Sequence, residues 1–173
     1  LGPGESFSVK VFTDYTMFFW SVFVLALVLL FVIHSIMKKI VVSKGVINVK
    51  RDREGISGMK VVLHIRNRSR KNILDINVID ILPSFVGTSP HSFGTLHPTK
   101  VSKTMLGNTK LTWHMGSLQK GEERIVSYVA TSRLSIIGNL ILPSAGVKYT
   151  VGNKTFKSRS NKITLFASVS EEN

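Results

Sequence analysis

The sequence predicts a mainly β protein in which one transmembrane helix precedes an antiparallel β-sandwich of about seven strands. The helix is predicted by a single apolar run, Tyr15 to Met37, that contains no Gly, Pro, Asp, Glu, Lys or Arg. The sandwich is predicted by the short segments after it, which alternate polar and apolar residues and are rich in β-branched and aromatic side chains. Because no amphipathic helix separates these segments, the strands are expected to pack as sheet on sheet.

The apolar run is long enough to cross a bilayer as a helix. About 20 residues span a hydrocarbon core of about 30 Å, and backbone groups in lipid must be satisfied within the segment. Tyr15 and Trp20 near one end and Lys38 and Lys39 at the other are typical of the two interfaces. A cleaved signal peptide is the alternative. The length of the run, the basic residues after it and the lack of a small-residue cleavage site argue against it.

Positive charge lies almost entirely after the run. The chain carries +13, and Glu5, Lys10 and Asp14 before the run sum to −1, which leaves +14 from residue 38 onward. The positive-inside rule then places the N-terminus outside the cell membrane and the C-terminal domain in the cytoplasm; an extracellular domain is the alternative. Six basic residues close to the run are candidates for contact with anionic lipid: Lys38, Lys39, Lys44, Lys50, Arg51 and Arg53.

These features divide the chain into five predicted segments. Residues 1–14 form an extramembrane segment, 15–37 the helix and 38–45 a basic juxtamembrane linker. The sandwich occupies 46–167, and the polar tail, 168–173, is expected to be disordered. The predicted strands of the sandwich are Met59–Ile65, Ile73–Asp80 with a bend, Lys110–Met115, Arg124–Ala130, Asn139–Leu142, Val147–Val151 and Lys162–Phe166.

The first residues repeat a pattern that occurs late in the sandwich. Leu1–Val11 matches Leu118–Tyr128 at Leu, Gly, Glu and the alternation that follows. We interpret the first segment as the end of an upstream β domain, or as a lone strand at the outer membrane surface.

Several motifs follow one another in a recognisable order: a strand ending in Asn67, then Asp80-x-Leu-Pro83, then Trp113-x-x-Gly-x-Leu-x-x-Gly121-Glu122, then Pro-x-Ala from Pro143. This order resembles an immunoglobulin-like repeat family known as domain of unknown function eleven, found in archaeal and bacterial surface proteins. The resemblance runs from about residue 46 to 166. It implies an immunoglobulin-like sandwich used for spacing, adhesion or assembly. The strong positive charge departs from the family, whose members are usually polar or acidic.

The motif residues have structural roles by their chemistry. A tryptophan on an alternating strand fills a core, a glycine permits a turn, and Asn and Asp bond the backbone at strand ends. Proline stops strand pairing. The seven structural motif residues are Asn67, Asp80, Pro83, Trp113, Gly121, Glu122 and Pro143.

Catalytic and metal chemistry find little support in the sequence. The histidines lack metal-ligand spacing, no Gly-x-Ser-x-Gly elbow is present, and no glycine-rich phosphate loop precedes a helix. We therefore expect no enzyme, no cofactor, no metal and no small-molecule substrate. Four basic residues form either a solvated turn or a polyanion patch, and the absence of interleaved aromatics disfavours nucleic acid: Arg66, Arg68, Arg70 and Lys71.

The leading hypothesis is a membrane-anchored immunoglobulin-like module for assembly or partner binding, with the lipid bilayer and other protein chains as partners. One alternative is an accessory subunit of a multi-chain membrane complex. The other is a membrane-tethered binder of polyanions, either anionic lipid or nucleic acid.

Overall fold

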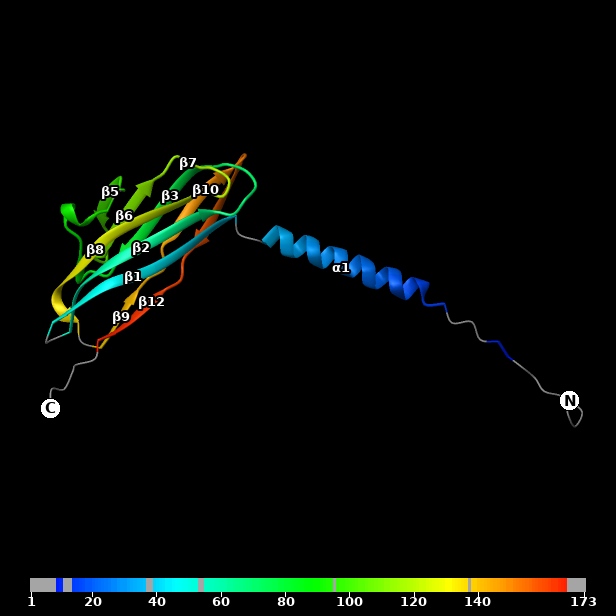
Figure 1. The fold of residues 1–173 in the computed structure, drawn as a ribbon, viewed down its shortest axis with the longest axis horizontal. Coiled ribbons are helices and arrows are strands. Elements are labelled where there is room, and N and C mark those ends of the chain that lie inside the picture. Colours follow the sequence, from blue (N-terminus) through cyan, green and yellow to red (C-terminus); the bar gives the residue numbers. More distant parts are fainter. Residues whose placement is uncertain are drawn as a thin grey trace, which may run out of the picture. The chain divides into compact units, whose positions relative to one another are not determined.

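A computed structural model of the chain describes residues 9–10, 14–36, 39–52, 55–94, 96–136 and 138–167. The chain divides into two units, residues 1–37 and 38–173. The first unit contains helix α1 (Thr16–Ile36), and the second contains the β-strands (Figure 1). Most of the predicted segment 1–14 and all of the predicted tail lie outside the described residues.

Helix α1 begins after an acidic residue. The carboxylate of Asp14 accepts hydrogen bonds from the hydroxyl of Thr16 and, at 2.9 Å, from its backbone N–H. These bonds, the side-chain bond first, lower the pKa of Asp14. They satisfy one of the N–H groups that have no partner within the first helical turn.

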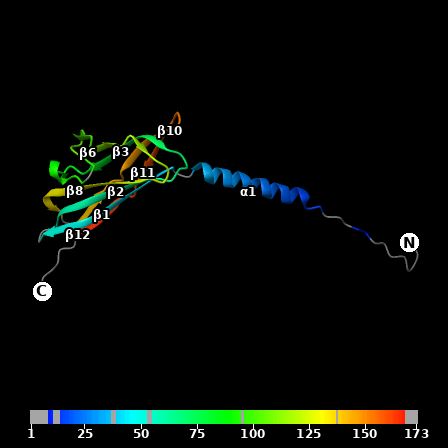
Figure 2. The same ribbon diagram turned by 45° about the horizontal axis from the view of Figure 1, so that its top comes forward.

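The second unit consists of two larger antiparallel sheets and one pair of strands. Sheet A contains, in spatial order, β1 (Ile40–Asp52), β2 (Gly55–Asn67), β8 (Glu123–Ile136) and β4 (Val86–Gly87). Sheet B contains β11 (Lys154–Arg159), β10 (Gly146–Val151), β3 (Ile73–Leu82), β6 (Thr109–His114) and β5 (Lys100–Lys103), with β7 (Ser117–Leu118) also on β3. Strands β12 (Ile163–Ala167) and β9 (Gly138–Leu142) form the pair. Figure 2 shows sheets A and B as the two layers of a sandwich.

Strand β1 begins inside the segment predicted to be a linker. The sandwich therefore starts at Ile40, not at residue 46. The alternation of β1 is hidden in the sequence because the inward position between Val42 and Val46 holds a charged residue, Lys44, which is 4% exposed. A lysine at an inward position breaks the alternation of polar and apolar residues by which a half-buried strand is predicted.

The described residues contain twelve strands, against about seven predicted. All seven predicted strands are present. The five additional ones are β1, the short β4, β5 and β7, and β11. The predicted bend in β3 is confirmed at Asp75, whose φ of 58° interrupts the ladder between Ile73 and Ile76. The long connection after β3 contains β4 and a short 3-10 helix, η1 (Pro90–Ser92).

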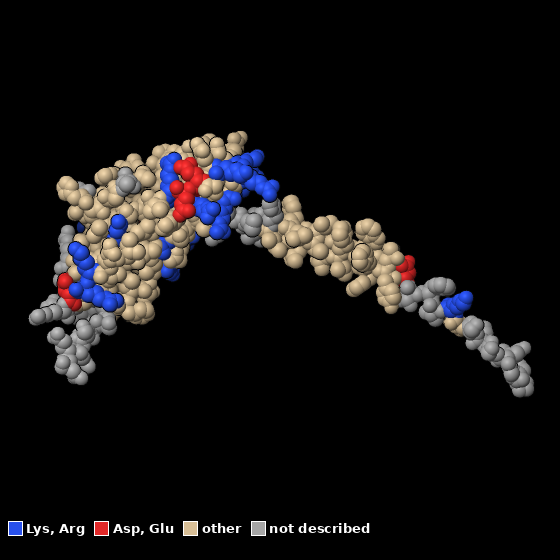
Figure 3. All heavy atoms as spheres, in the orientation of Figure 1, with Lys and Arg blue, Asp and Glu red and all other residues tan. Residues whose placement is uncertain are grey.

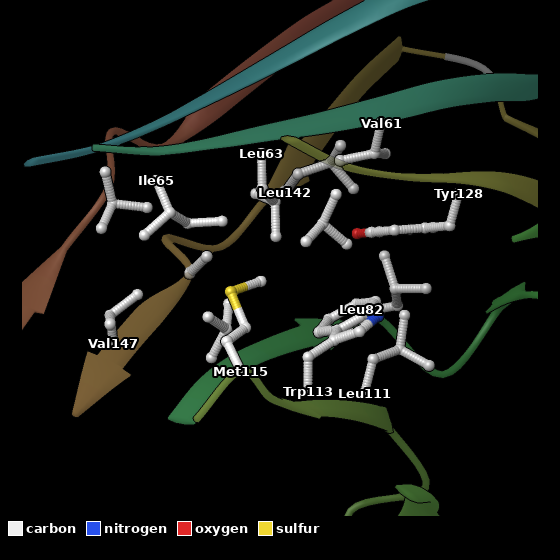
Figure 4. Close-up of a cluster of buried hydrophobic side chains, with 14 of the residues drawn as sticks. Val61, Leu63, Ile65, Leu82, Leu111, Trp113, Met115, Tyr128, Leu142 and Val147 are labelled. Atoms are coloured by element: carbon white, nitrogen blue, oxygen red, sulfur yellow. The ribbon is translucent and has the colours of Figure 1, made fainter. Parts of the chain in front are cut away.

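Apolar side chains from the two layers meet in one core. Met59, Val61, Leu63 and Ile65 on β2 are at most 1% exposed, as their alternation predicts. Val61, Leu63 and Ile65 lie across the core from Trp113, with Leu111 and Met115 beside it (Figure 4). The predicted core role of Trp113 is confirmed, since it is fully buried and its indole N–H donates to the carbonyl of residue 96 at 3.2 Å.

Candidate functional site

Apolar side chains cover the entire circumference of α1. The stretch Thr16–Ile33 is long and apolar enough to cross a membrane, with a mean hydropathy of 2.7 and none of it buried. Met17 and Phe31, for example, are 87% and 72% exposed. Water solvates such a continuous apolar surface poorly.

Asp80 is the centre of a buried polar network that joins sheets A and B. Its Oδ1 lies 2.7 Å from the Nζ of Lys44, and both side chains are 0% exposed. The same Oδ1 accepts the N–H of Ile81 at 2.9 Å, while Oδ2 accepts the hydroxyl of Tyr128 at 2.7 Å. Lys44 also donates to the carbonyl of Pro143 at 3.0 Å. The expected backbone bond of Asp80 is therefore present, but Asp80 lies within β3 and its main partners are side chains.

The hydroxyl of Tyr128 is held in its neutral form by this network. Burial raises its pKa well above the usual range, and the charge of Asp80 and the hydrogen bond to it raise it further. The ring of Tyr128 stacks on Trp113 with centroids 5.9 Å apart. Tyr128 therefore contributes an apolar ring to the core and a hydroxyl to Asp80, a structural use of both ends of the side chain.

Asn67 organises the turn regions at one end of the sandwich. It is fully buried, and its amide N–H groups donate to the carbonyls of Lys71, Leu118 and Gln119 at 2.9 to 3.1 Å. Its side-chain oxygen accepts the N–H and the hydroxyl of Ser69 at 2.9 and 2.7 Å. The predicted role of Asn67, bonding backbone at a strand end, is confirmed, and the structure adds that it links two turns.

The second of these turns is closed by Glu122. Its carboxylate accepts the N–H of Gln119 at 2.6 Å and the Nε of Arg124 at 2.8 Å. These bonds, the backbone bond first, lower the pKa of Glu122. Gly121 has a φ of +75°, a conformation that L side chains rarely adopt, so the predicted turn role of this glycine is confirmed. The motif prolines follow the last residues of β3 and β9, Leu82 and Leu142, as predicted.

Three of the six predicted lipid-contact residues are not available near the start of the domain. The ammonium of Lys44 is inside the sandwich, so it does not reach a headgroup. Lys50 and Arg51 are exposed, but they lie far along β1, about 30 Å from Ile40 at the usual rise per residue. Proximity in the sequence does not mean proximity in space here, because the segment is an extended strand.

Lys39 is the predicted lipid-contact residue that the structure places at the start of the domain. It is half-buried, with Nζ 4.6 Å from the ring centroid of Phe156, in cation–π geometry. Lys38 and Arg53 lie outside the described residues.

The predicted basic turn is exposed. Arg66 ends the outward side of β2, and Arg68, Arg70 and Lys71 follow it in the connection to β3. The N–H of Arg68 donates to the carbonyl of Lys39 at 2.9 Å, which fixes the turn beside the start of β1. Figure 3 shows basic side chains gathered at this end of the sandwich, with carboxylates among them.

The histidines do not form a metal site in the part of the chain that the structure describes, where no group of three or more His, Cys, Asp or Glu residues is found. His64 pairs with Glu123 at 2.7 Å on the surface, and His114 contacts the side-chain oxygen of Asn77 at 2.9 Å. His97 lines an open pocket of about 300 Å³ together with Phe93 and other loop residues.

The outward faces of the two sheets differ in chemistry. On sheet A, Val41, Val62 and Val129 are half-buried, and Ile47 and Ile125 are 48% and 49% exposed. On sheet B, five basic side chains occupy the outward positions. The five residues are Lys100, Lys110, Lys148, Lys157 and Arg159. The sequence did not predict this group because its members are far apart along the chain, and only the register of the strands brings them together.

Comparison with solved structures finds a fold similar to that of a bacterial pilin. The full-length major pilin SpaD from Corynebacterium diphtheriae matches with a TM-score of 0.51 at 11% identity, over 73% of this chain and 35% of the pilin chain. An exo-β-N-acetylglucosaminidase from Vibrio harveyi, in complex with N-acetylglucosamine, matches with a TM-score of 0.47 at 10% identity, over 72% of this chain and 18% of the enzyme chain. The second unit is therefore an antiparallel, immunoglobulin-like β-sandwich module.

No protein-family model matches the sequence, and no curated protein matches it either. The resemblance to the immunoglobulin-like repeat family stays a prediction. The chain spans about a third of the pilin and less than a fifth of the glucosaminidase. The likeness to the pilin is one of fold alone.

Proposed function

We propose that the chain is a single-pass membrane protein in which α1 anchors an immunoglobulin-like module that binds partners rather than catalysing a reaction. The observation that carries the proposal is the uninterrupted apolar surface of Thr16–Ile33. The polar groups of the motifs support it, since Asp80, Asn67 and Glu122 are all engaged in holding the fold. The resemblance to surface-protein repeats supports an assembly role.

Membrane fractionation with an alkaline carbonate wash tests the anchor. Each arginine at the centre of a transmembrane helix costs about 2.5–3.5 kcal/mol of insertion free energy. An L27R/L30R variant should therefore leave the membrane pellet, whereas I47R/I125R, which places the same charges on exposed positions of the sandwich, should stay in it. Intact-mass measurement of the membrane-bound chain distinguishes an anchor from a signal sequence. Loss of the residues up to the end of α1 would refute the anchor.

The proposed orientation has the N-terminal segment outside and the module in the cytoplasm. It is supported by the excess of basic residues after the helix. Because the chain contains no cysteine, single cysteines report their own side of the membrane. A membrane-impermeant maleimide should label K10C on intact cells and should label T155C only after lysis. Labelling of T155C on intact cells would place the module outside.

A second candidate function, subunit of a multi-chain membrane complex, is supported by the apolar outward face of sheet A. Ile47 and Ile125 expose about half of their side chains there, and apolar residues in the centre of a face favour a protein partner. Purification in mild detergent should then yield other chains in stoichiometric amounts. An I47D/I125D variant should lose them, while T150D/T155D on sheet B should keep them. Purification of the unaltered chain alone contradicts this function.

A further inference from the structure

The outward face of sheet B carries five basic side chains, Lys100, Lys110, Lys148, Lys157 and Arg159. The register aligns Lys157, Lys148, Asn77 and His114 in one row across β11, β10, β3 and β6. The next outward row contains Arg159, Gly146, Ile79, Thr112 and Lys100. The row between them, which includes Val78 and Trp113, is buried, so both basic rows point away from the core. Neighbouring strands are about 4.8 Å apart, which spreads the charges over a flat area about 20 Å wide.

The charges on this face are not neutralised by neighbours. Within the described residues the ion pairs involve Lys44, His64 and Arg124, and none includes a cation of the sheet B face. The five strands contain two carboxylates. Asp80 is buried on the other side of the sheet, and Asp75 is exposed at the bend near the start of β3, next to Asn77 of the first row. The face therefore has a net positive charge, which attracts anions.

We propose that the outward face of sheet B binds the anionic headgroups of a lipid bilayer. The side chains on the face favour lipid over the other polyanions. A protein interface is usually centred on Tyr, Trp, Phe or Met and is depleted in Lys, whereas the rows here hold Lys, Arg, Thr, Asn and His, with one glycine and one half-buried isoleucine, Ile79. Single-stranded nucleic acid is bound by aromatic side chains on which bases stack, and the rows contain no Phe, Tyr or Trp. Flexible lysine and arginine side chains spread over a sheet face can bind the mobile anionic headgroups of a planar bilayer.

The path of the chain also favours lipid binding, given the membrane anchor proposed above. Only residues 37–39 separate α1 from β1. The start of β1 contacts β11, the edge strand of sheet B: the hydroxyl of Ser158 donates to the carbonyl of Ile40 at 2.9 Å. Lys157 and Arg159 flank Ser158 on the opposite side of β11, where the basic face begins. A short tether gives such a face a high effective concentration at the bilayer.

The test uses the full-length chain reconstituted in nanodiscs of neutral lipid or of neutral lipid mixed with phosphatidylserine. A donor fluorophore on T155C reports the approach of the sheet B face to acceptor-labelled headgroups, and the same donor on S43C reports the outward face of sheet A. Energy transfer from T155C should rise with anionic lipid and fall with salt, because the Debye length shrinks from about 10 Å at 0.1 M to about 3 Å at 1 M. Transfer from S43C should not rise.

Charge-matched variants separate this face from the overall charge of the domain. K148Q/K157Q/R159Q should lower the docking equilibrium constant about a hundredfold, since each basic residue contributes about 1 kcal/mol near an anionic surface and 1.4 kcal/mol corresponds to a factor of ten. K50Q/K60Q/R51Q removes the same charge from β1 and β2 and should have little effect.

Three results would overturn the proposal. Equal losses in the two triple variants would mean that the overall charge of the domain drives docking. Energy transfer insensitive to phosphatidylserine, in nanodiscs whose chain co-purifies with the disc, would reject lipid binding while leaving the anchor intact. A stoichiometric acidic protein that shields T155C from labelling in neutral membranes would assign the face to a protein partner.

Discussion

The ammonium of Lys44 and the carboxylate of Asp80 lie 2.7 Å apart with both side chains fully buried. Lys44 belongs to sheet A and Asp80 to sheet B, so the pair joins the two layers through the core. Tyr128 and the carbonyl of Pro143 complete the hydrogen bonds of the two charges. Buried charges persist only when they are paired and hydrogen-bonded in this way.

Removing one partner of this pair should strongly destabilise the sandwich. A K44M variant leaves the carboxylate of Asp80 buried without its counter-charge, which costs about 3–5 kcal/mol of unfolding free energy. Urea unfolding of the full-length chain in detergent, followed by the fluorescence of the buried Trp113, measures the loss.

Two further variants show that the loss comes from the unpaired charge. K60M makes the same substitution on the outward face of β2 and should change the unfolding free energy by less than about 0.5 kcal/mol. Adding D80N to K44M removes the stranded charge, so the double variant should be more stable than K44M alone. A double variant that is less stable than K44M would assign the cost to packing instead.

The pair of Lys44 and Asp80 also explains why one strand of sheet A could be predicted from the sequence and its neighbour could not. Strand β2 was predictable because four apolar residues from Met59 to Ile65 alternate on one side, and all are buried. Strand β1 was not, because the core position of Lys44 carries a charge whose partner is 36 residues away in sequence. A contact at that separation is set by the packing of the two sheets and leaves no local pattern.

The candidate surfaces also differ in how far the sequence predicts them. The apolar helix is one continuous segment, and its length and composition suffice to predict it. The basic face of sheet B depends on which strands are neighbours, and Lys100 and Arg159 reach the same row only through three intervening strands. The basic turn from Arg66 to Lys71 stood out in the sequence because its four charges lie within six residues, although it is only one of several basic regions of the folded domain.

Removal of the Asn67 amide, or its replacement by a carboxylate, should destabilise the domain. N67A leaves the buried carbonyl of Leu118 without a donor, at a cost of about 1–3 kcal/mol. N67D should cost more, because a carboxylate would face the three carbonyls that the amide now serves. Thermal unfolding of the two variants gives the order, and N77A, at a half-buried position, is the control. Equal stability of N67D and the unaltered chain would contradict the role assigned to the amide.

Gly121 should be sensitive to a methyl group for conformational reasons alone. Its φ is +75°, and a Cβ added there would meet no atom within 4 Å. G121A should therefore cost about 1–2 kcal/mol through backbone strain. Gly146 also has open space for a Cβ but no positive φ, so G146A in urea unfolding isolates the effect of conformation. Equal effects of the two variants would show that strain at Gly121 is not the cause.

Alkaline pH should weaken the sandwich through Tyr128. Because burial and Asp80 raise its pKa in the folded state, its contribution to stability is complete below the unfolded pKa of about 10 and is lost as pH rises above it. Y128F cannot ionise, and it also leaves Asp80 without one donor. The difference in unfolding free energy between the unaltered chain and Y128F should be constant below about pH 10 and shrink above it. A difference that stays constant at higher pH would show that the hydroxyl ionises equally in both states.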